Sequence, residues 1–501
     1  MRRAPLLALA LLAAACATAA KKPADAARQA EHGLPAATEF AEGPERAAYA
    51  AAHAHEAKGD AASGEAARAE WAQAGQGYAA LAEKPAAAVW RVPLLHRAAE
   101  LLLRAQRWER AGEVAGQLVA EARANDASKA IGARLAASAA LSGAGAAVKA
   151  GQLDKLDLGT AGPKKQKPVP AAWRRVVESA DAYAARAAAD PEAGRSAAER
   201  RAGASPAELA LAAAEVHYAH GDLDGARTRF EAVMDRWPAD AEVLEQAVPL
   251  YLATFHARAD RDGHDAAVER VRERVQKDAA RASAPKEKEA FAKVLDFLAR
   301  ARAGARFGAA ERLLQQGKPA EAAQAFEAVA AEPGVGEPAN ALHNAAIAWD
   351  RAGDAAKAAR VREKILKDHP ASPVAQEDAL ALAVHRSRAG DHATSGRLYE
   401  EFLARWPDAP SRCLALRNAA SELDVAGRAA EAAWRYLAFA REPACAKAAP
   451  DVAGRALLRA GRLFEAQAKA AYGEAAALPG MTEEEAKGIV AEAKKRLKGL
   501  Q

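Results

Sequence analysis

Apolar residues recur along most of this chain at the spacing of an amphipathic α-helix. Residues 339–370 show the pattern clearly: a first helical stretch, a Gly-Asp pair at 353–354, a second helical stretch and a final proline. The first stretch would bury one apolar stripe, which consists of Leu342, Ala345, Ala346 and Trp349. Glycine suits the left-handed backbone that ends a helix, and proline stops the next one. Because β-branched runs of period two are scarce, the pattern predicts an all-α chain of helix pairs.

The same pattern recurs along the chain with a glycine at its centre. The central glycines are Gly221, Gly317, Gly353, Gly390, Gly427 and Gly461, and the last five are separated by 36, 37, 37 and 34 residues. A period in this range indicates a helical solenoid. One helix pair cannot bury its own apolar face, so each pair would be stabilised by its neighbours in the stack.

Each unit resembles the tetratricopeptide repeat, a helix-turn-helix unit of 34 residues. In the unit that starts at Cys413, small and apolar residues occupy the places that the family fills in the same way: Leu416, Ala419, Ala420, Leu423, Ala432, Tyr436 and Phe439. The resemblance implies an α-solenoid of stacked antiparallel helix pairs, whose first helices line a concave face that holds a peptide or a helix of another protein. It is closest within residues 303–445, where Ser395 replaces the usual small alanine.

The repeat pattern weakens toward the N-terminus. Gln106 replaces the turn glycine of one unit. The first unit suggests an insertion after Gly59-Asp60, and a later unit suggests a long turn through Asp260 to Gly263. These units are therefore expected to be degenerate forms of the same helix pair.

Breaks in the pattern divide the chain into seven parts. The stretch 151–171 is rich in Gly, Pro and Lys and has no helical period, which is typical of a linker. The expected parts are 1–15 as a lipoprotein signal peptide, 16–44 as a flexible tether, 45–150 as degenerate repeat-like helices, 151–171 as a linker, 172–302 as repeat-like helices, 303–446 as tandem repeats and 447–501 as atypical capping helices.

The N-terminus has the composition of a bacterial leader peptide. Two arginines precede an apolar stretch, residues 4–15, that is too short to span a bilayer. The sequence LAAAC that ends at Cys16 resembles a lipobox, with the usual leucine displaced by one position to Leu12. This resemblance implies cleavage before Cys16 and lipidation of its thiol. Cleavage after Ala19, which would release a soluble secreted protein, is the alternative.

A lipidated Cys16 would attach the protein to a membrane. The next residue is Ala17, and not the aspartate that commonly retains lipoproteins at the inner membrane. The leader therefore favours an outer-membrane lipoprotein that faces the periplasm. Two or more acyl chains would make this anchoring stable.

Composition and charge narrow the classes of function. Hydrophobic residues make up 51% of the chain but aromatic residues only 5%, because alanine supplies most of the apolar count. This balance fits many close-packed helices better than one thick core. The net charge is +5, with both signs interspersed along the chain. A nucleic-acid interface would need a basic stripe with stacking aromatics, which the sequence does not show.

No residue pattern for catalysis or cofactor binding is present. The HExxH, phosphate-binding-loop, GxSxG and strand-following GxGxxG motifs do not occur in the sequence. We therefore expect no enzyme, no cofactor, no metal and no small-molecule substrate. His217 and His220 are three residues apart, but packing explains them better than a metal site because no convincing ligand set completes them.

The remaining cysteines indicate a disulfide. Cys413 opens a repeat and Cys445 follows the second helix of the same repeat, so antiparallel packing would bring them together. We predict a bond between them, with two free thiols as the alternative. In an oxidising compartment, loop closure by this bond would stabilise the fold by about 3–4 kcal/mol.

The resemblance also implies a partner-binding surface. Family geometry points to positions two, five, nine, twelve and thirteen of each first helix, which include Asn340, His343, Asp350, Arg351, Glu377, Arg388, Arg417 and Asp424. A solvated helix face is the alternative interpretation of each residue. Glu377 and Leu414 stand where a carboxylate clamp of this family would have lysine, so clamping of a partner's C-terminus is not expected.

The leader and the long repeat array together resemble the tetratricopeptide lipoproteins of the myxobacterial gliding-motility machinery. The resemblance implies a scaffold that holds protein partners in a bacterial envelope complex. Two other classes remain open. One is an outer-membrane protein assembly lipoprotein, which usually has fewer repeats, and the other is a periplasmic cell-wall factor that houses a peptidoglycan enzyme.

Overall fold

The computed structural model describes residues 33–160, 162–191, 193, 203–476 and 482–498. Within these ranges the regular structure is helical, and no β-strand occurs. The chain separates into two compact units, Met1–Leu298 and Ala299–Gln501, with the boundary inside helix α13, Pro285–Gln315. The signal peptide, Cys16 and most of the expected tether lie outside the described residues.

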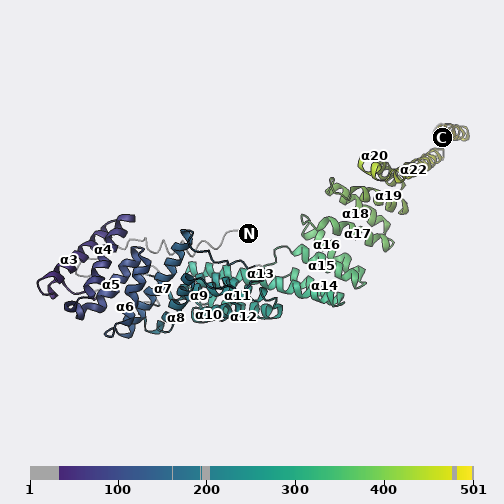
Figure 1. Cartoon of the computed structure of the whole chain (residues 1–501). Coiled ribbons are helices and arrows are strands. Elements are labelled where there is room, and N and C mark those ends of the chain that lie inside the picture. Colours follow the sequence, from purple (N-terminus) through teal and green to yellow (C-terminus); the bar gives the residue numbers. More distant parts are fainter. Residues whose placement is uncertain (1–32, 161, 192, 194–202, 477–481, 499–501) are drawn as a thin grey trace. The chain divides into compact units, whose positions relative to one another are not determined.

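Unit 1 is a succession of helices in which each helix packs mainly against the next one in sequence (Figure 1). Short 3-10 helices cover Ala37–Glu39, Pro85–Trp90 and Ala187–Ala189. The α-helices before α13 are α3 (Pro44–Ala61), α4 (Gly64–Ala82), α5 (Arg91–Arg104), α6 (Trp108–Ala120), α7 (Asp126–Lys149), α8 (Ala171–Ala184), α9 (Pro206–Ala219), α10 (Leu223–Arg236), α11 (Ala241–His256) and α12 (Arg261–Ala279).

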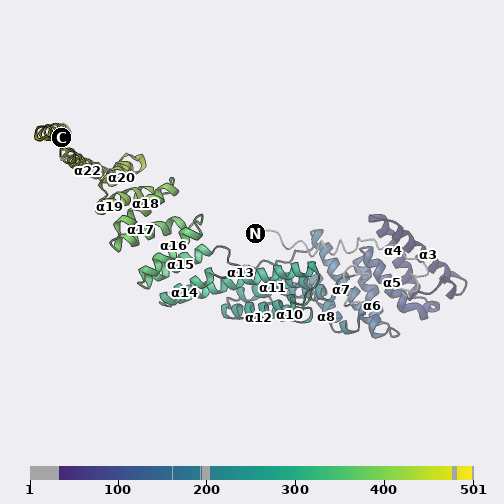
Figure 2. The same ribbon diagram turned by 180° about the vertical axis from the view of Figure 1, so that it is seen from behind.

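Unit 2 continues the same arrangement, and Figure 2 shows its helices from the other side. The helices after α13 are α14 (Pro319–Ala330), α15 (Pro338–Arg351), α16 (Ala355–Asp368), α17 (Ala375–Arg388), α18 (His392–Arg405), α19 (Arg412–Val425), α20 (Ala429–Arg441), α21 (Pro443–Ala448), α22 (Pro450–Ala476) and α23 (Glu483–Lys498). Short turns join helices that pack on each other, so the fold is all-α and consists of stacked antiparallel helix pairs of the tetratricopeptide type.

The glycines that set the repeat occupy the turns between paired helices. Five of them have φ between 74° and 80°, the left-handed region in which only glycine is unstrained: Gly221, Gly317, Gly353, Gly390 and Gly427. After three of these turns an aspartate caps the second helix by accepting a hydrogen bond from a backbone N–H, as Asp354 does from Lys357. The sixth predicted turn is wrong, because Gly461 lies inside the continuous helix α22.

Two further turns adopt the same left-handed backbone without a glycine. Gln106, which replaces the glycine of its unit, has a φ of 58°, and Ala259 has a φ of 57°. The long turn predicted through Asp260 to Gly263 is wrong, because Asp260 caps α12 and Gly263 lies in the first turn of that helix. The repeat geometry therefore overrides the residue preference at Gln106 and Ala259.

The insertion predicted after Gly59 is also wrong. Helix α3 runs through Gly59 to Ala61, and α4 begins at Gly64. A Cβ atom at Gly59 would lie 2.4 Å from the Trp71 Cδ1 atom, so this glycine permits close packing of α3 against α4. Its role is close approach within a pair, and not a turn.

Alanine fills the contacts between helices, as the composition indicated. Ala345, Ala346 and Ala358 are 0% exposed, so helices α15 and α16 approach each other closely. Larger core side chains come from both helices of the pairs, such as Tyr218 of the first helix α9 and Phe326 and Phe402 of the second helices α14 and α18. Small residues on one helix and rings on the next fill the space between pairs.

Helix α7 is the one described helix that is long and apolar enough to cross a membrane, judged by length and composition. In its apolar stretch of 18 residues, 56% is buried inside the protein. It packs against α6 and α8 in unit 1. This burial is that of a core helix in a helical stack.

Candidate partner-binding face in unit 2

Direct contacts hold the first helices of successive pairs in unit 2 side by side. Asp350 of α15 contacts His385 of α17, with Oδ1 and Nε2 2.7 Å apart. Ser387 of α17 donates a hydrogen bond to Glu422 of α19, with an Oγ–Oε1 distance of 2.8 Å. Asp424 of α19 accepts two hydrogen bonds from the guanidinium of Arg459 in α22, at 2.6 and 2.7 Å. The side of unit 2 formed by these first helices is therefore a continuous surface.

All eight residues predicted for partner binding lie on three of these helices. Helix α15 carries Asn340, His343, Asp350 and Arg351, helix α17 carries Glu377 and Arg388, and helix α19 carries Arg417 and Asp424. Their surroundings divide them into two groups: residues that project into solvent, and residues that join neighbouring helices.

The exposed group is dominated by arginines. Arg351 and Arg388 are exposed and make no hydrogen bond or ion pair with another residue in the described part of the chain. Arg417 is exposed as well, and its guanidinium contacts only the neighbouring Asn418 side chain, at 3.4 Å. Asn340 is bonded to Glu337 in its own helix turn. Three arginines of the predicted face thus remain accessible to a partner.

Apolar side chains accompany these arginines. Leu414 and Val425, at both ends of α19, are 43% and 63% exposed, and Leu458 of α22 is 66% exposed. Leu414 and Val425 occupy positions two and thirteen of their repeat, which are among the positions predicted above for partner binding. We call Arg351, Arg388, Leu414, Arg417 and Val425 the first-helix face. The two apolar members were not predicted from the sequence, because exposure cannot be read from residue type alone.

The second group of predicted residues belongs to a buried ionic network between two helix pairs. His343 Nδ1 lies 3.0 Å from Asp378 Oδ2, and Asp350 Oδ2 lies 2.5 Å from Arg362 Nη2. Arg362 and Asp378 are 3% and 0% exposed, and Arg362 Nε lies 3.4 Å from Asp378 Oδ1. These contacts join α15, α16 and α17, so His343 and Asp350 act first as structural residues.

The network was not visible in the sequence. Arg362, Asp378 and His385 were not selected, because each partner lies on a different helix and no local pattern pairs them. The one available signal was a charged residue at a position of α17 that faces the preceding pair. Removing one partner of a buried ion pair typically costs about 3–5 kcal/mol, so the network fixes the junction between these pairs.

The network also sets the protonation of His343. Its hydrogen bond to Asp378, assisted by the charges of Asp378 and Glu377, raises the pKa of the imidazole above the ordinary value of 6.5 despite partial burial. Glu377 itself is exposed and lies 3.9 Å from His343 Nε2. His343 and Glu377, which were both predicted as partner-binding residues, thus lie close together although they belong to different first helices.

Asp424 has a comparable structural role at the C-terminal end. Besides the two bonds from Arg459, it accepts a hydrogen bond from the Tyr436 hydroxyl at 3.3 Å. These contacts join α19, α20 and α22. The negative charge of Asp424 is therefore balanced by the Arg459 guanidinium, so Asp424 adds little negative charge to the first-helix face.

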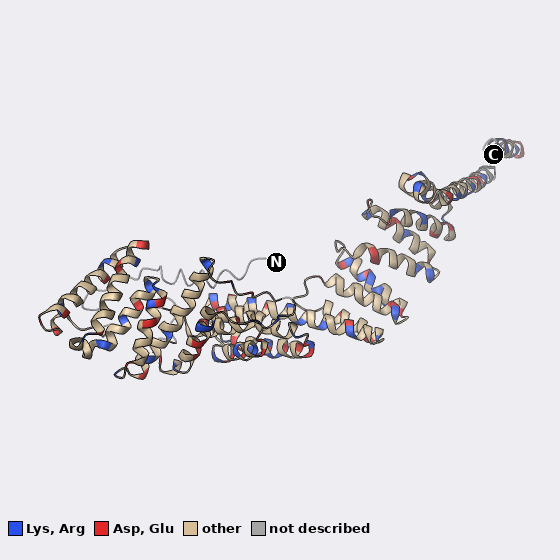
Figure 3. Cartoon of the chain, in the orientation of Figure 1, with Lys and Arg blue, Asp and Glu red and all other residues tan. Residues whose placement is uncertain are grey.

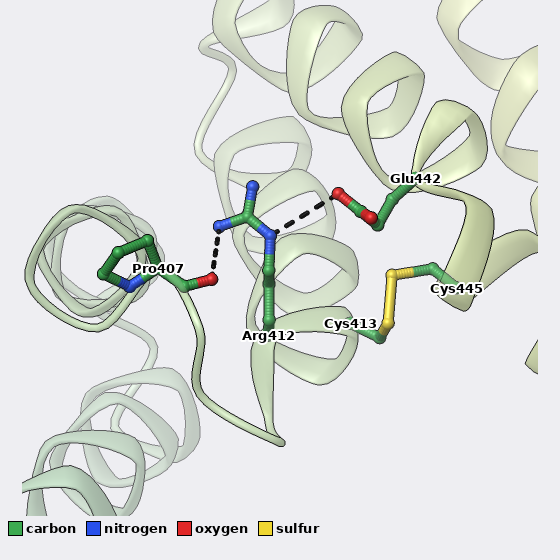
Figure 4. The surroundings of a disulfide bond; sticks show 5 residues. All are labelled: Pro407, Arg412, Cys413, Glu442 and Cys445. Atoms are coloured by element: carbon green, nitrogen blue, oxygen red, sulfur yellow. Dashed lines mark hydrogen bonds and ion pairs between the residues drawn. A yellow bond between two sulfur atoms is a disulfide. The ribbon is translucent and has the colours of Figure 1, made fainter.

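A disulfide closes the repeat next to this end. Cys413 at the start of α19 is bonded to Cys445 in α21, with an S–S distance of 2.10 Å and a Cα–Cα distance of 5.3 Å. This is the pair that the sequence analysis predicted. Arg412 beside it donates to the Pro407 carbonyl oxygen at 3.3 Å and pairs with Glu442 at 3.6 Å (Figure 4). The bond ties the end of one pair to the helices that follow.

The other candidates offer little chemistry. Acidic and basic residues are interspersed over the helices in the part of the chain that the structure describes (Figure 3). No three metal-ligand side chains converge within the described ranges. His217 contacts the capping residue Asp222, with Nδ1 and Oδ2 2.7 Å apart, and His220 Nδ1 lies 2.8 Å from the Val216 carbonyl oxygen. Both histidines therefore serve the turn after α9.

No protein-family model matches the chain, and no curated protein matches it. Among solved structures, the crystal structure of the P58(IPK) TPR domain is similar at 13% identity, covering 75% of this chain and 98% of that chain with a TM-score of 0.22. The crystal structure of the APC/C hetero-tetramer Cut9-Hcn1 is similar at 11% identity, and the match covers 86% of this chain and 94% of that chain with a TM-score of 0.23. The assignment of the fold rests on the turns and the helix packing described above.

Proposed function

We propose that this protein is a non-catalytic scaffold that binds protein partners through the first-helix face of unit 2. The observation that carries the proposal is the combination of three accessible arginines with exposed Leu414 and Val425 on adjoining helices. Exposed apolar groups beside unpaired charges are typical of interaction sites. The buried network around Arg362 joins α15, α16 and α17, and helices fixed relative to each other before binding lower its entropic cost.

The chemistry of the face selects the kind of partner. The accessible charges of Arg351, Arg388 and Arg417 favour carboxylates, which a guanidinium binds in a bidentate manner. Leu414 and Val425 favour apolar side chains between those carboxylates. The fitting partner is therefore an acidic segment with interspersed apolar residues.

The proposed location is the periplasmic side of the outer membrane. The leader sequence supports lipidation at Cys16, and a disulfide between Cys413 and Cys445 suits an oxidising compartment. Within the envelope we propose a multiprotein complex, with the gliding-motility machinery as the first candidate because of the resemblance in architecture. Barrel assembly and cell-wall synthesis are the competing complexes.

In-cell crosslinking followed by affinity purification and mass spectrometry tests the scaffold. The test variant reverses the arginines of the face: Arg351→Glu, Arg388→Glu and Arg417→Glu. A matched control reverses three exposed charges on the second helix α16: Arg360→Glu, Lys364→Glu and Lys367→Glu. We expect the first variant to lose the partners and the control to keep them. Loss in both variants, or in neither, would refute this face.

The identity of the retained partners tests the complex. Motor-coupled motility proteins would support the gliding assignment, whereas barrel-assembly or peptidoglycan-synthesis proteins would replace it. Fractionation of a Cys16→Ser variant tests the anchor. We expect this variant to leave the membrane fraction, and unchanged membrane association would contradict lipidation at Cys16.

A further inference from the structure

The connection between α7 and α8 is longer than its geometry requires. The two helices pack directly against each other, and neighbouring helices of this kind are usually joined by about 2–8 residues. Here residues 150–170 separate them, and the described residues 150–160 and 162–170 contain no helix. Long connections inside compact units commonly carry a function. We call residues 153–160 and 162–169 the strap.

The strap lies against helix α9, the first helix of the next pair. The Tyr218 hydroxyl donates a hydrogen bond to the Gly159 carbonyl oxygen at 2.8 Å. The Lys167 backbone N–H donates to the His220 carbonyl oxygen, also at 2.8 Å. Tyr218 stands at position twelve of its repeat, which the family uses for binding. The strap thus covers a position of α9 that corresponds to those predicted for partner binding in unit 2.

Lys164 makes the most specific contact of the strap. Its ammonium lies 4.8 Å from the centre of the Tyr218 ring and 2.9 Å from Asp157 Oδ2, and its side chain is only 8% exposed. The hydrogen bond from Lys164 holds the pKa of Asp157 below its usual range. Because the face of an aromatic ring attracts cations, the Tyr218 ring would also suit a lysine from another chain.

The rest of the strap makes few contacts, one of which is a hydrogen bond from the Trp173 indole N–H to the Asp154 carbonyl oxygen at 3.2 Å. Leu153, Leu156 and Val169 are partly buried against the cluster that contains Trp173 and Val216. Most other residues of the strap are exposed. A segment with few buried apolar contacts opens at low free energy compared with the helical core. Opening of the strap is therefore expected to cost less free energy than unfolding of the helix pairs.

The face of α9 carries a second feature that points to a ligand. Glu215 precedes Tyr218 by three residues, so the two side chains share one face of the helix. Glu215 is mostly buried, yet it makes no hydrogen bond or ion pair with a residue in the described part of the chain, and burial raises its pKa to about 7. A carboxylate in this environment is stabilised by an incoming cation.

We propose that the strap is a removable internal ligand, and that the α9 face receives an extended, lysine-bearing segment of a protein partner once the strap is displaced. Tyr218 would receive a partner's lysine as it receives Lys164, and Glu215 would receive a second one. This site lies in unit 1 and differs in charge preference from the first-helix face of unit 2. The two proposals therefore stand or fall separately.

A synthetic peptide with the sequence of residues 153–169 and a fluorescent label is the probe. Its binding to the full chain is measured by fluorescence anisotropy. An opened variant carries Leu153→Ser, Leu156→Ser and Val169→Ser, and a locked variant carries Lys167→Cys and His220→Cys. We expect the opened variant to bind the peptide about tenfold or more tightly than the wild type. In the wild type the closed strap covers the α9 face, so only a fraction of the molecules can bind the peptide.

The locked variant keeps the proposal testable if the opened variant fails to fold. We expect no binding to the oxidised locked variant and recovery on reduction, with reduced wild-type protein as the control for the native disulfide. A peptide with Lys164→Ala should bind about tenfold more weakly than the parent peptide. Equal binding to the wild-type and locked proteins, or no binding to any variant, would show that the strap is a permanent part of the fold.

Discussion

His343 and Asp378 face each other across the boundary between two helix pairs, with the Nδ1 and Oδ2 atoms 3.0 Å apart. The pair belongs to different repeats, 35 residues apart in sequence. Together with Arg362 and Asp350 it makes the junction between these two helix pairs an ionic one.

The junction should lose stability as the pH rises. The pKa of His343 is raised above 6.5 in the folded state, so its contribution is fully present below the unfolded pKa and is lost as pH rises through the folded pKa. Amide hydrogen exchange of α15 and α17, corrected for intrinsic rates, should show falling protection as the pH rises above about 6.5. A His343→Gln variant should lack this component, and an unchanged pH dependence in it would contradict the assignment.

Breaking the buried ion pair should destabilise unit 2. Arg362→Met leaves Asp378, which is 0% exposed, without its guanidinium, and should cost about 3–5 kcal/mol in denaturant unfolding. The double variant Arg362→Met, Asp378→Leu should cost clearly less than the sum of the two single changes. Arg360→Met, an exposed change on the same helix, should stay within about 0.5 kcal/mol. Additive losses would mean that the two charges are not coupled.

Glycine should stabilise the protein at the two left-handed turns that lack it. Gln106→Gly and Ala259→Gly should each raise the free energy of unfolding by about 0.5–1 kcal/mol, since relief of backbone strain exceeds the added freedom of the unfolded chain. Thermal unfolding measures the change. Loss of stability in both variants would show that their backbones are not strained.

Replacing glycine by alanine should have opposite effects at Gly353, in a turn, and at Gly304, inside a helix. A Cβ at either position would meet nothing within 4 Å, so only the backbone decides the effect of an alanine. Gly353→Ala, at a φ of 79°, should cost about 1 kcal/mol, whereas Gly304→Ala inside α13 should stabilise by about 0.5–1 kcal/mol. The same sign in both variants would contradict the role of Gly353 as the turn residue.

Loss of the disulfide should weaken the C-terminal repeat. The bond between Cys413 and Cys445 closes a loop with a sequence separation of 32, so Cys413→Ser with Cys445→Ser should cost about 3–4 kcal/mol. Peptide mapping of the unreduced protein should recover the two cysteines as one linked pair. Alkylation of both thiols without reductant would show that the bond is not formed in the native protein.

Local chemistry made much of the fold predictable. Gly353 and Gly390 predict the turns in which they lie, because only glycine is free of strain there. The spacing of these turns predicts where each helix pair begins and ends. The same argument failed at Gly461, because glycine is also tolerated inside a long helix, and at Gln106, where repeat packing supplies the turn. A residue type indicates what is possible at a site, and the neighbouring helices decide the outcome.

The candidate face was less predictable than the fold. The repeat register placed Arg351, Arg388 and Arg417 on the first helices, where they are exposed. It also selected His343 and Asp350, whose partners Asp378 and His385 come from the next repeat. Contacts between repeats depend on side-chain reach across two helices, and a sequence pattern within one helix does not contain that information.

Photocrosslinking from single positions in living cells tests the central claim most directly. A photoreactive amino acid replaces Val425 on the first-helix face in one strain, and Lys364 on the exposed side of α16 in a control strain. We predict crosslinked partner proteins with acidic segments from Val425 and none of the same partners from Lys364. Crosslinks from Lys364 alone, or identical products from both positions, would contradict partner binding at the first-helix face.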